Sequence, residues 1–210
     1  MKKLAVIVLI AMAAAACQPK EKEVAQSENE MTNLETRNRW GEFTEIAPTE
    51  ISENVIQLIG KDWMLITAGT ENSFNSMTAS WGALGEIWSN PASFIMVRNS
   101  RYTHQFLQEN EIYTLCFFDE EYKGALTIMG TKSGRDTDKV KESGLTPVAT
   151  PNGSMAYAEA KMVIECKKLY AEPFKEESFA NNEIFEKIYV QGDKSMHTLY
   201  IGEILNVWKK

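Results

Sequence analysis

The chain has 210 residues, of which 44% are hydrophobic and 24% charged, with 12 glycines and 6 prolines. This composition is typical of a globular protein and excludes a disordered, collagen-like or repetitive chain, and the length predicts one domain with a substantial core. A net charge of −7 argues against nucleic-acid binding. Two histidines and three cysteines, without a CxxC or HExxH motif, argue against a zinc site.

The first segment of the chain predicts export. Two lysines precede an apolar run at 4–16, which is too short to span a membrane and fits the hydrophobic region of a signal peptide. The run ends in three alanines before Cys17 and resembles the lipobox of bacterial lipoproteins, in which the cysteine is lipidated. The resemblance implies a lipoprotein signal peptide at 1–16, with the lipid on Cys17 as the only membrane attachment. Gln18, rather than Asp, favours the outer membrane of the cell envelope. The alternative is a plain secretory signal with a chance cysteine.

Residues 17–38 are charged and polar and contain few large apolar side chains. Such a segment cannot contribute to a core and predicts a flexible tether. An acidic recognition tail is the alternative, although Lys20 and Lys22 interrupt the acidic run. The folded domain is therefore expected at 39–210.

The domain is predicted to consist of strands with short helices in the connections. Strands are expected where apolar or β-branched runs are bounded by turn residues, at 63–68, 94–97, 112–118, 161–170 and 198–207. Helices are expected at 102–108, 120–129 and 136–143, the last with Asp136 as N-cap and Gly144 at its end. Several strands without regular βαβ alternation predict a mainly antiparallel β-barrel, and the lack of a GxGxxG motif argues against a Rossmann domain.

The segment at 72–81 is rich in small and hydroxylated side chains. Thr78, Ala79 and Ser80 lie between Met77 and Trp81, and Asn75 and Ser76 come just before Met77. Small side chains let a flat ligand approach the backbone, whose N–H and C=O groups can pair with the edge of a heterocycle. The alternative is a polar strand whose hydroxyls face water.

A second segment, at 97–103, leads from a strand into a helix. A helix N-terminus favours a phosphate, and Ser100, Arg101 and Thr103 can add hydroxyl and guanidinium donors. The alternative is that Ser100 only caps the helix and Arg101 is solvated.

A third segment, at 130–136, is a basic loop punctuated by glycines. It does not fit a P-loop, because the spacing between Gly124 and Gly130 is wrong and Thr131 separates Gly130 from Lys132. Contact with an anion and a simple solvated turn both remain open.

Together these segments resemble a known family. The runs NSMTASW (75–81), RNSRYT (98–103), FFDEEY (117–122) and GTKSGRD (130–136) are similar, in order and spacing, to the flavin reductase-like family of FMN-binding split barrels. The resemblance covers about residues 55–208. It implies an antiparallel split β-barrel of six strands and the Greek-key type, usually a homodimer, with non-covalently bound FMN near the subunit interface.

The resemblance also implies the residues that would bind FMN. The flavin ring and ribityl chain would be lined by residues of the first segment: Asn75, Met77, Thr78, Ala79, Ser80 and Trp81. The phosphate would be held by residues of the other two: Ser100, Arg101, Thr103, Lys132, Ser133 and Arg135. No acid–base residue is implied, since hydride transfer is the flavin's own chemistry.

The resemblance implies an FMN-dependent oxidoreductase that takes electrons from NAD(P)H or another donor. Two alternatives remain open: an electron-transfer flavoprotein supplied by a redox protein, which the export signal favours, and a flavin-binding surface lipoprotein without turnover. A pyridoxamine-phosphate oxidase relative has less support from the motifs.

Several other residues are expected to be structural. His104 and His197 are interpreted as structural; the alternatives are that His197 reaches the flavin and that His104 lies at the rim of the cofactor site. Cys116 and Cys166 are expected as buried free thiols, with a disulfide left open. Four aromatic residues are expected in the core: Trp63, Trp88, Tyr113 and Phe117.

Overall fold

A computed structural model of the chain describes residues 42–191 and 193–210. The signal peptide, the lipidation site and the tether predicted at 1–38 lie outside the described residues. Within the described part, no helix is long and apolar enough to cross a membrane.

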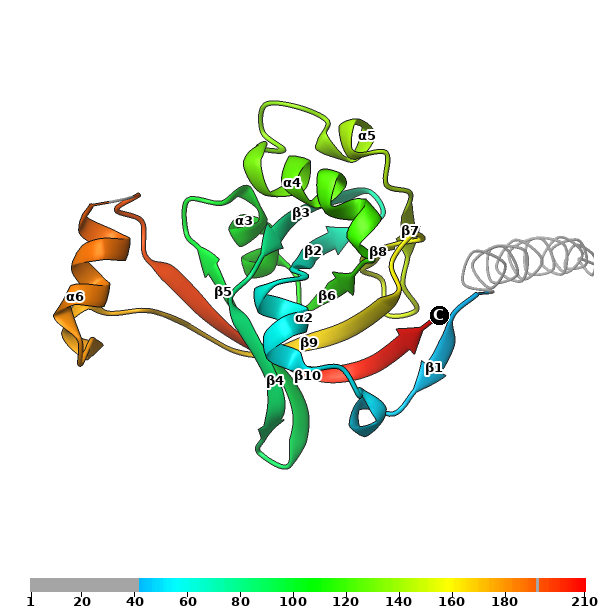
Figure 1. The fold of residues 1–210 in the computed structure, drawn as a ribbon, viewed down its shortest axis with the longest axis horizontal. Helices are drawn as coiled ribbons and strands as arrows, with labels where there is room; N and C mark the ends of the chain where they lie inside the picture. Colours follow the sequence, from blue (N-terminus) through cyan, green and yellow to red (C-terminus); the bar gives the residue numbers. More distant parts are fainter. Residues whose placement is uncertain (1–41, 192) are drawn as a thin grey trace, which may run out of the picture. The chain divides into compact units, whose positions relative to one another are not determined.

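The main sheet has eight antiparallel strands in the order β3-β2-β6-β9-β10-β5-β4, with β1 paired to β10 (Figure 1). Their bounds are β1 Thr44–Ile46, β2 Met64–Thr70, β3 Ser73–Ala79, β4 Gly82–Ile87, β5 Asn90–Arg98, β6 Ile112–Phe117, β9 Met162–Pro173 and β10 His197–Lys209. A small second sheet pairs β7 (Pro147–Ala149) with β8 (Met155–Tyr157). The predicted architecture, mainly antiparallel β with short helices in the connections, is confirmed. The main sheet has more strands than the six that the family resemblance implies.

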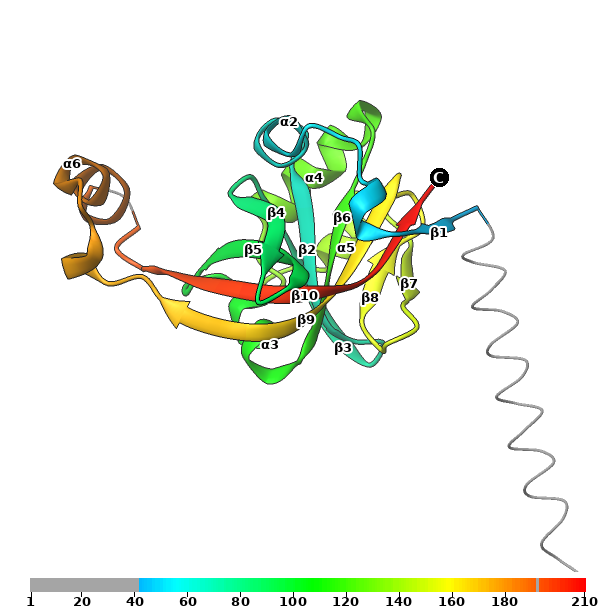
Figure 2. The same ribbon diagram turned by 90° about the horizontal axis from the view of Figure 1, so that it is seen from below.

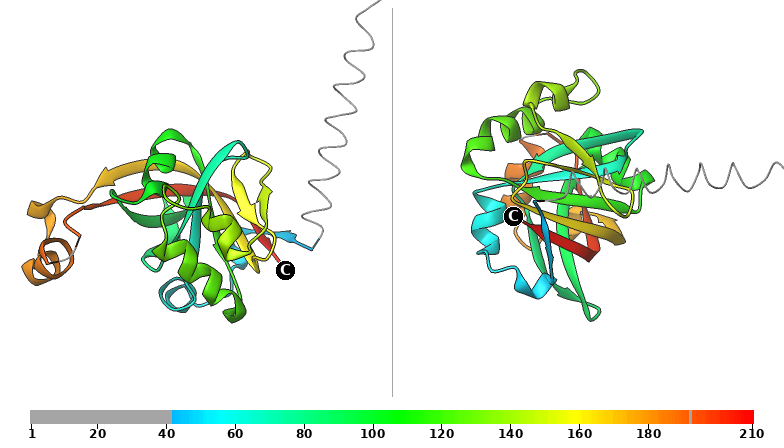
Figure 3. Two further views of the ribbon diagram at one scale, coloured as in Figure 1. Left: turned by 90° about the horizontal axis from the view of Figure 1, so that it is seen from above. Right: turned by 90° about the vertical axis from the view of Figure 1, so that its right-hand side faces the viewer.

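Five short α-helices occupy the connections in the described part: α2 Val55–Gly60, α3 Tyr102–Glu109, α4 Lys123–Thr131, α5 Lys139–Ser143 and α6 Asn182–Phe185. Helix α3 packs on β2 and β3, while α4 packs on β3 and on α5, so that α4 and α5 group at one side of the barrel (Figure 3). The predicted start of α5 is wrong. Asp138, not Asp136, is its N-cap and accepts a hydrogen bond from Lys141 N at 3.1 Å. Gly144 ends the helix in the left-handed region, as predicted.

Strand β2 is buried on both faces of the sheet, because its successive residues enter different clusters. Met64 and Ile66 of β2 lie in the barrel interior with Leu107 and Ile164. Leu65, between them, lies in a second cluster beneath α4 and the β7–β8 sheet. A strand buried on both faces gives a continuous apolar run, which is the pattern that the sequence shows at 63–68.

Two of the expectations for individual residues are confirmed and one is wrong. Tyr113 and Phe117 are fully buried, and Cys116 and Cys166 are buried free thiols that lie in different clusters. Trp88, expected in the core, is 58% exposed at the turn between β4 and β5.

Strands β9 and β10 continue beyond the barrel and carry a projecting segment, residues 174–191, which we call the arm (Figure 2). It contains α6 and a following π-helical turn, Glu186–Val190. Its interior is aromatic, because Phe179 packs against Phe174, Phe185 and Tyr189 with ring centroids 5.4–6.2 Å apart. The arm therefore has a small core of its own beside the start of β10.

Candidate functional site

Two adjoining cavities lie where β3 and β5 end. The first, the apolar cavity, has a volume of about 340 Å³ and is walled mainly by residues of β3, β5, α4 and the segment after β3. The second, the cationic cavity, has a volume of about 480 Å³ and lies between α3, the 132–139 segment and Asp193. Met77, Arg98 and Arg101 line both, so the two cavities form one continuous site.

Strand β3 and helix α4 make the apolar cavity by packing closely. The Thr78 hydroxyl donates to the Leu126 carbonyl at 2.5 Å. Gly130, near the end of α4, faces the Thr78 side chain so closely that a Cβ atom would lie 3.1 Å from it. This approach places five predicted residues in the wall of the cavity: Met77, Thr78, Ala79, Ser80 and Trp81.

The cationic cavity concentrates positive charge in an acidic protein. Its lining includes five cations, Arg98, Arg101, Lys132, Arg135 and Lys139, and a single carboxylate, that of Asp193. Lys139 is buried and Arg98 half-buried, so water screens these two charges less than those of Arg101, Lys132 and Arg135, which are exposed. Several charges of one sign around one hollow attract a counter-ion. The chemistry of this cavity therefore suits a multiply charged anion.

All six predicted phosphate-binding residues line the cationic cavity. Arg101 is the N-cap of α3 and spans the site by donating from Nη1 to the Gly130 carbonyl at 2.9 Å. Arg135 lies over the Tyr102 ring, 4.6 Å from its centroid, and donates to the Ser100 carbonyl at 3.3 Å. Lys132 is ion-paired with Glu142, so its charge is already partly offset.

Ser100 is not a helix cap, contrary to the simpler alternative for this segment. Its hydroxyl donates to Asp193 Oδ2 at 2.7 Å, and its backbone N–H donates to Ser195 Oγ at 2.9 Å. The Ser100 hydrogen bond, together with nearby Arg98, lowers the pKa of Asp193. The Asp193 carboxylate thus occupies the Ser100 hydroxyl, and the Ser195 hydroxyl occupies the Ser100 N–H, both of which are donors that an anion could use.

Asn75 lies at the cationic cavity rather than at the apolar cavity for which it was predicted. It is buried, and its Nδ2 donates to Thr103 Oγ1 at 2.7 Å. Its Oδ1 lies where a side chain on Gly134 would be, so the 130–136 loop packs directly on it. Asn75 therefore joins β3, α3 and this loop, which supports the cavity from beneath.

Lys139 is a lining residue that sequence reasoning missed. Its side chain is 4% exposed, and Nζ donates to the carbonyls of Met129 and Lys132 at 3.2 and 3.4 Å. Burial, with a smaller effect of Arg101, lowers its pKa to about 8. The sequence placed it within the helix predicted at 136–143, and nothing in its neighbours marks it as buried.

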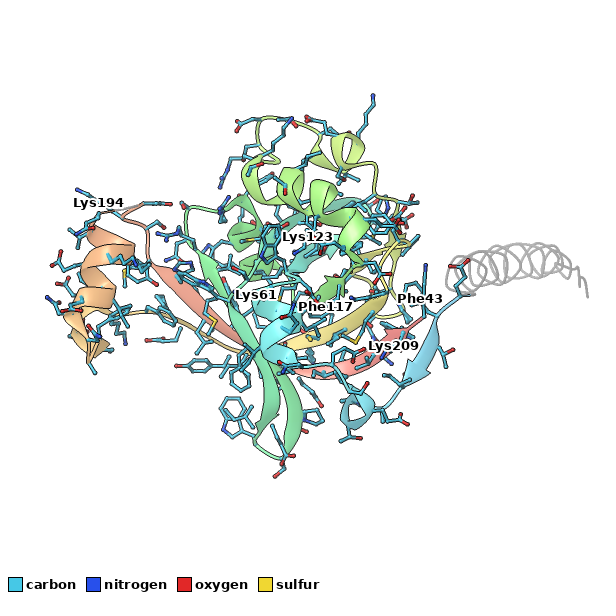
Figure 4. All side chains as sticks on the ribbon, viewed as in Figure 1. Phe43, Lys61, Phe117, Lys123, Lys194 and Lys209 are labelled. Carbon is cyan, nitrogen blue, oxygen red and sulfur yellow. The ribbon has the colours of Figure 1, made fainter. Side chains whose placement is uncertain are left out.

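Two tryptophans border the apolar cavity. Trp63, expected in the core, lines it with a positive φ of 70°, and the Lys123 ammonium lies 3.9 Å from its ring centroid. Lys123, at the start of α4, also donates to the carbonyls of Lys61 and Asp62, and Figure 4 shows Lys123 close to Lys61. Trp81, 45% exposed, packs against the His197 ring.

The two histidines differ in position. His197 lines the apolar cavity beside Trp81, which is the position expected from the alternative to a structural role. Burial, and then the charge of Arg98, lowers its pKa to about 4. His104 lines neither cavity and pairs with Thr198 Oγ1 at 3.3 Å.

Comparisons with known proteins identify the family and the fold. Residues 57–210 match the family model described as "Flavin reductase like domain". An FMN-binding domain of a flavin reductases-like enzyme from Shewanella baltica has a TM-score of 0.57 at 14% identity, covering 80% of this chain and 76% of that one. Flavoredoxin of Desulfovibrio vulgaris has a TM-score of 0.55 at 23% identity, with 70% and 69% covered. An NADH:FAD oxidoreductase from Streptomyces globisporus has a TM-score of 0.53 at 17% identity, with 71% and 75% covered. No curated protein sequence matches the chain.

Proposed function

Because the chain belongs to the flavin reductase-like domain family, we propose that it is an oxidoreductase that binds FMN non-covalently in the two adjoining cavities. The observation that carries the proposal is the division of one site into an apolar part and a part lined by five cations. FMN has the same division, with a planar ring at one end and a phosphate of nearly two negative charges at the other.

The residues present fit the phosphate. Ser100, Arg101 and Lys139 would bind it, together with Arg135. Each charge-assisted hydrogen bond contributes about 1.5–3 kcal/mol, so three or four support micromolar or tighter binding. A short phosphate site without an adenine-binding motif favours FMN over FAD.

The apolar cavity would hold the ring, between Met77, Ala79 and Trp81 on one side and α4 on the other. Bound FMN supplies hydride and electron transfer. The chain's own residues orient it and exclude water, and the backbone N–H groups at 78–80 would stabilise negative charge on the reduced ring.

The direct test is the visible spectrum of the protein after incubation with FMN and desalting. We expect retained flavin absorption, and we expect Arg101→Ala to weaken FMN binding by about 10- to 100-fold, because Arg101 lines both cavities. A colourless wild-type protein, with all FMN in the wash, contradicts the proposed function.

Asp193→Asn is expected to tighten FMN binding, by about threefold to tenfold. The substitution keeps a hydrogen-bond acceptor for Ser100 but removes the negative charge that competes with a phosphate for it. Titration of both proteins with FMN and with riboflavin provides the measurement. The gain is expected for FMN alone, since riboflavin has no phosphate; an equal gain for both would place the phosphate elsewhere.

The electron donor separates the leading proposal from its alternatives. The Streptomyces globisporus relative is named for NADH, whereas the Desulfovibrio vulgaris relative is a flavoredoxin. Anaerobic bleaching of the bound flavin by NADH or NADPH would support a reductase. Bleaching only by dithionite or a reduced redox protein would support an electron-transfer flavoprotein, and loss of flavin on dialysis a binding protein.

We further propose a homodimer through the outer face of the sheet. Phe94 and Met96 of β5 pair with Ile201 and Leu199 of β10, and none of the four belongs to a core cluster. Tyr170 of β9, opposite Ile201, is 42% exposed and extends this apolar face. The mass measured by light scattering, for wild type and Phe94→Lys, tests this.

Attachment to the cell envelope through a lipid on Cys17 is also proposed. The support for this proposal is the two lysines, the apolar run at 4–16 and the cysteine that follows it. Metabolic labelling with a fatty acid, compared between wild type and Cys17→Ala, tests it.

A further inference from the structure

The arm contacts His197, in the wall of the candidate site, through the rings of Phe174 and Tyr189, and Tyr189 alone bonds the imidazole. Tyr189, in the π-helical turn, is 4% exposed and its hydroxyl lies 2.9 Å from His197 Nδ1. The two rings meet edge to face with centroids 5.6 Å apart. On its other side the His197 ring lies 5.0 Å from that of Trp81, at the apolar cavity. An unbroken row of rings therefore leads from the arm to the cavity wall.

The hydrogen bond between Tyr189 and His197 has a preferred direction. If Nδ1–H donated to the phenol oxygen, the buried phenol hydrogen would have no acceptor among the described residues, which is unfavourable. Burial raises the pKa of Tyr189, so the phenol keeps its proton, and the Arg98 guanidinium, 5.5 Å from the ring centroid, offsets this only in part. The same guanidinium charge disfavours an imidazolium at His197. Tyr189 therefore donates to Nδ1, which leaves the proton of the neutral imidazole on Nε2.

The charges around His197 support a neutral ring. Burial has the largest effect against protonation, Arg98 and Arg101 act in the same direction, and only Asp193 acts for it. Nε2 has no hydrogen-bond partner within residues 42–191 and 193–210, although His197 lines the apolar cavity. An N–H group held in an apolar wall is suited to a carbonyl oxygen of a planar ligand.

We propose that Tyr189 is a positioning residue, which holds His197 so that its Nε2–H donates to a carbonyl oxygen in the apolar cavity. This inference rests on the proposed function, because the oxygen belongs either to the bound flavin or to a quinone-like acceptor that stacks on it. The arm thereby determines how strongly the site binds one of these two ligands.

Nuclear magnetic resonance of the FMN-free protein tests the proton's position directly. The chain has only two histidines, so His104→Gln leaves the His197 imidazole alone in a long-range ¹H–¹⁵N spectrum. We expect a protonated Nε2 and an unprotonated Nδ1 from pH 8 down to about 5. In Tyr189→Phe the Nδ1 resonance is expected to move, because its donor is lost. A wild-type spectrum with the proton on Nδ1 overturns the inference.

Ligand binding tests the role of that proton, with Tyr200→Phe as the matched control. Tyr200 lies three residues from His197, and its buried hydroxyl has no partner in the described part of the chain. We expect Tyr189→Phe, but not Tyr200→Phe, to weaken the binding of either FMN or the electron acceptor by about threefold to tenfold. A change in the FMN dissociation constant assigns the oxygen to the flavin. A change only in the KM of a water-soluble benzoquinone, measured on dithionite-reduced holoprotein, assigns it to the acceptor.

Two substitutions of His197 separate donation from packing. The amide nitrogen of Gln reaches the position of Nε2, whereas that of Asn corresponds to Nδ1. His197→Gln is therefore expected to retain wild-type binding and His197→Asn to match Tyr189→Phe. Equal loss in both, or no effect of Tyr189→Phe on either ligand, contradicts the inference. Failure of the wild type to bind FMN would instead contradict the proposed function, and the spectrum of the FMN-free protein is independent of that result.

Discussion

Replacing Lys139 with methionine is expected to weaken FMN binding by about 10- to 100-fold without destabilising the fold. The buried ammonium of Lys139 lies in the cationic cavity, where a phosphate would replace part of its lost hydration. Without a phosphate the burial of this charge is unfavourable, which is why its pKa falls to about 8. Methionine has nearly the same length and no charge. In Lys139→Met the affinity for FMN is thus expected to fall while the free energy of unfolding stays the same or rises.

Lys141→Met is the matched control, because Lys141 lies on the same short helix but is exposed and lines neither cavity. It changes the net charge by the same amount. Fluorescence titration with FMN and thermal unfolding of both variants provide the measurements. Equal, small losses of affinity in the two variants would show that only overall charge matters and that Lys139 does not bind the phosphate.

The pH dependence of FMN binding follows from the same residue. Above pH 8 the Lys139 side chain of the free protein loses its proton, and a phosphate then has to restore it. We expect the affinity of the wild type to fall as pH rises through 8, with a proton taken up on binding, and Lys139→Met to lack this fall. The stability of the fold changes with pH in the opposite direction to the affinity for FMN. Between pH 8 and about 10.4 the unfolded chain binds more protons at this residue than the folded chain, so rising pH stabilises the fold.

The part of the fold that could be predicted from the sequence consists of elements with strong local signals. The strand at 63–68 has a continuous apolar run, and Gly144 ends α5 because only glycine readily adopts its positive φ. The hairpin of β4 and β5 was missed because its turn is formed by Trp88 and Ser89, both with positive φ. Turns of that kind usually contain Asn or Gly, so the sequence has no turn signal there.

The sequence predicted which segments form the candidate site, but not the contacts that their side chains make with one another. The segments at 75–81 and 98–103 were singled out, and they line one continuous site. Their internal contacts could not be predicted, because Ser100 binds Asp193 from 93 positions along the chain. Lys139 was missed, and a structural role was preferred for His197, for a related reason: whether a polar residue is buried depends on segments distant in sequence, and one sequence gives no measure of that.

Gly202→Ala is expected to lower the free energy of unfolding by about 3 kcal/mol or more and the melting temperature by roughly 10 °C. Gly202 lies in β10, where the register with β9 shifts, and a methyl group there would overlap the hydroxyl and ring carbons of Tyr113. Tyr113 has no space to retreat, because it is fully buried and its hydroxyl bonds Ser93 Oγ at 2.7 Å.

The structure offers both a control and a rescue for this substitution. A methyl group on Gly85, in β4, would meet no atom within 4 Å, so Gly85→Ala is expected to leave stability unchanged or slightly raised. Adding Tyr113→Phe to Gly202→Ala removes the oxygen nearest to the new methyl group. Since the two side chains touch, their effects are expected to be non-additive, and the double variant should recover part of the lost stability. Strict additivity in thermal unfolding would mean that β10 moves away from Tyr113 instead, and that the barrel at this register shift is less rigid than its packing indicates.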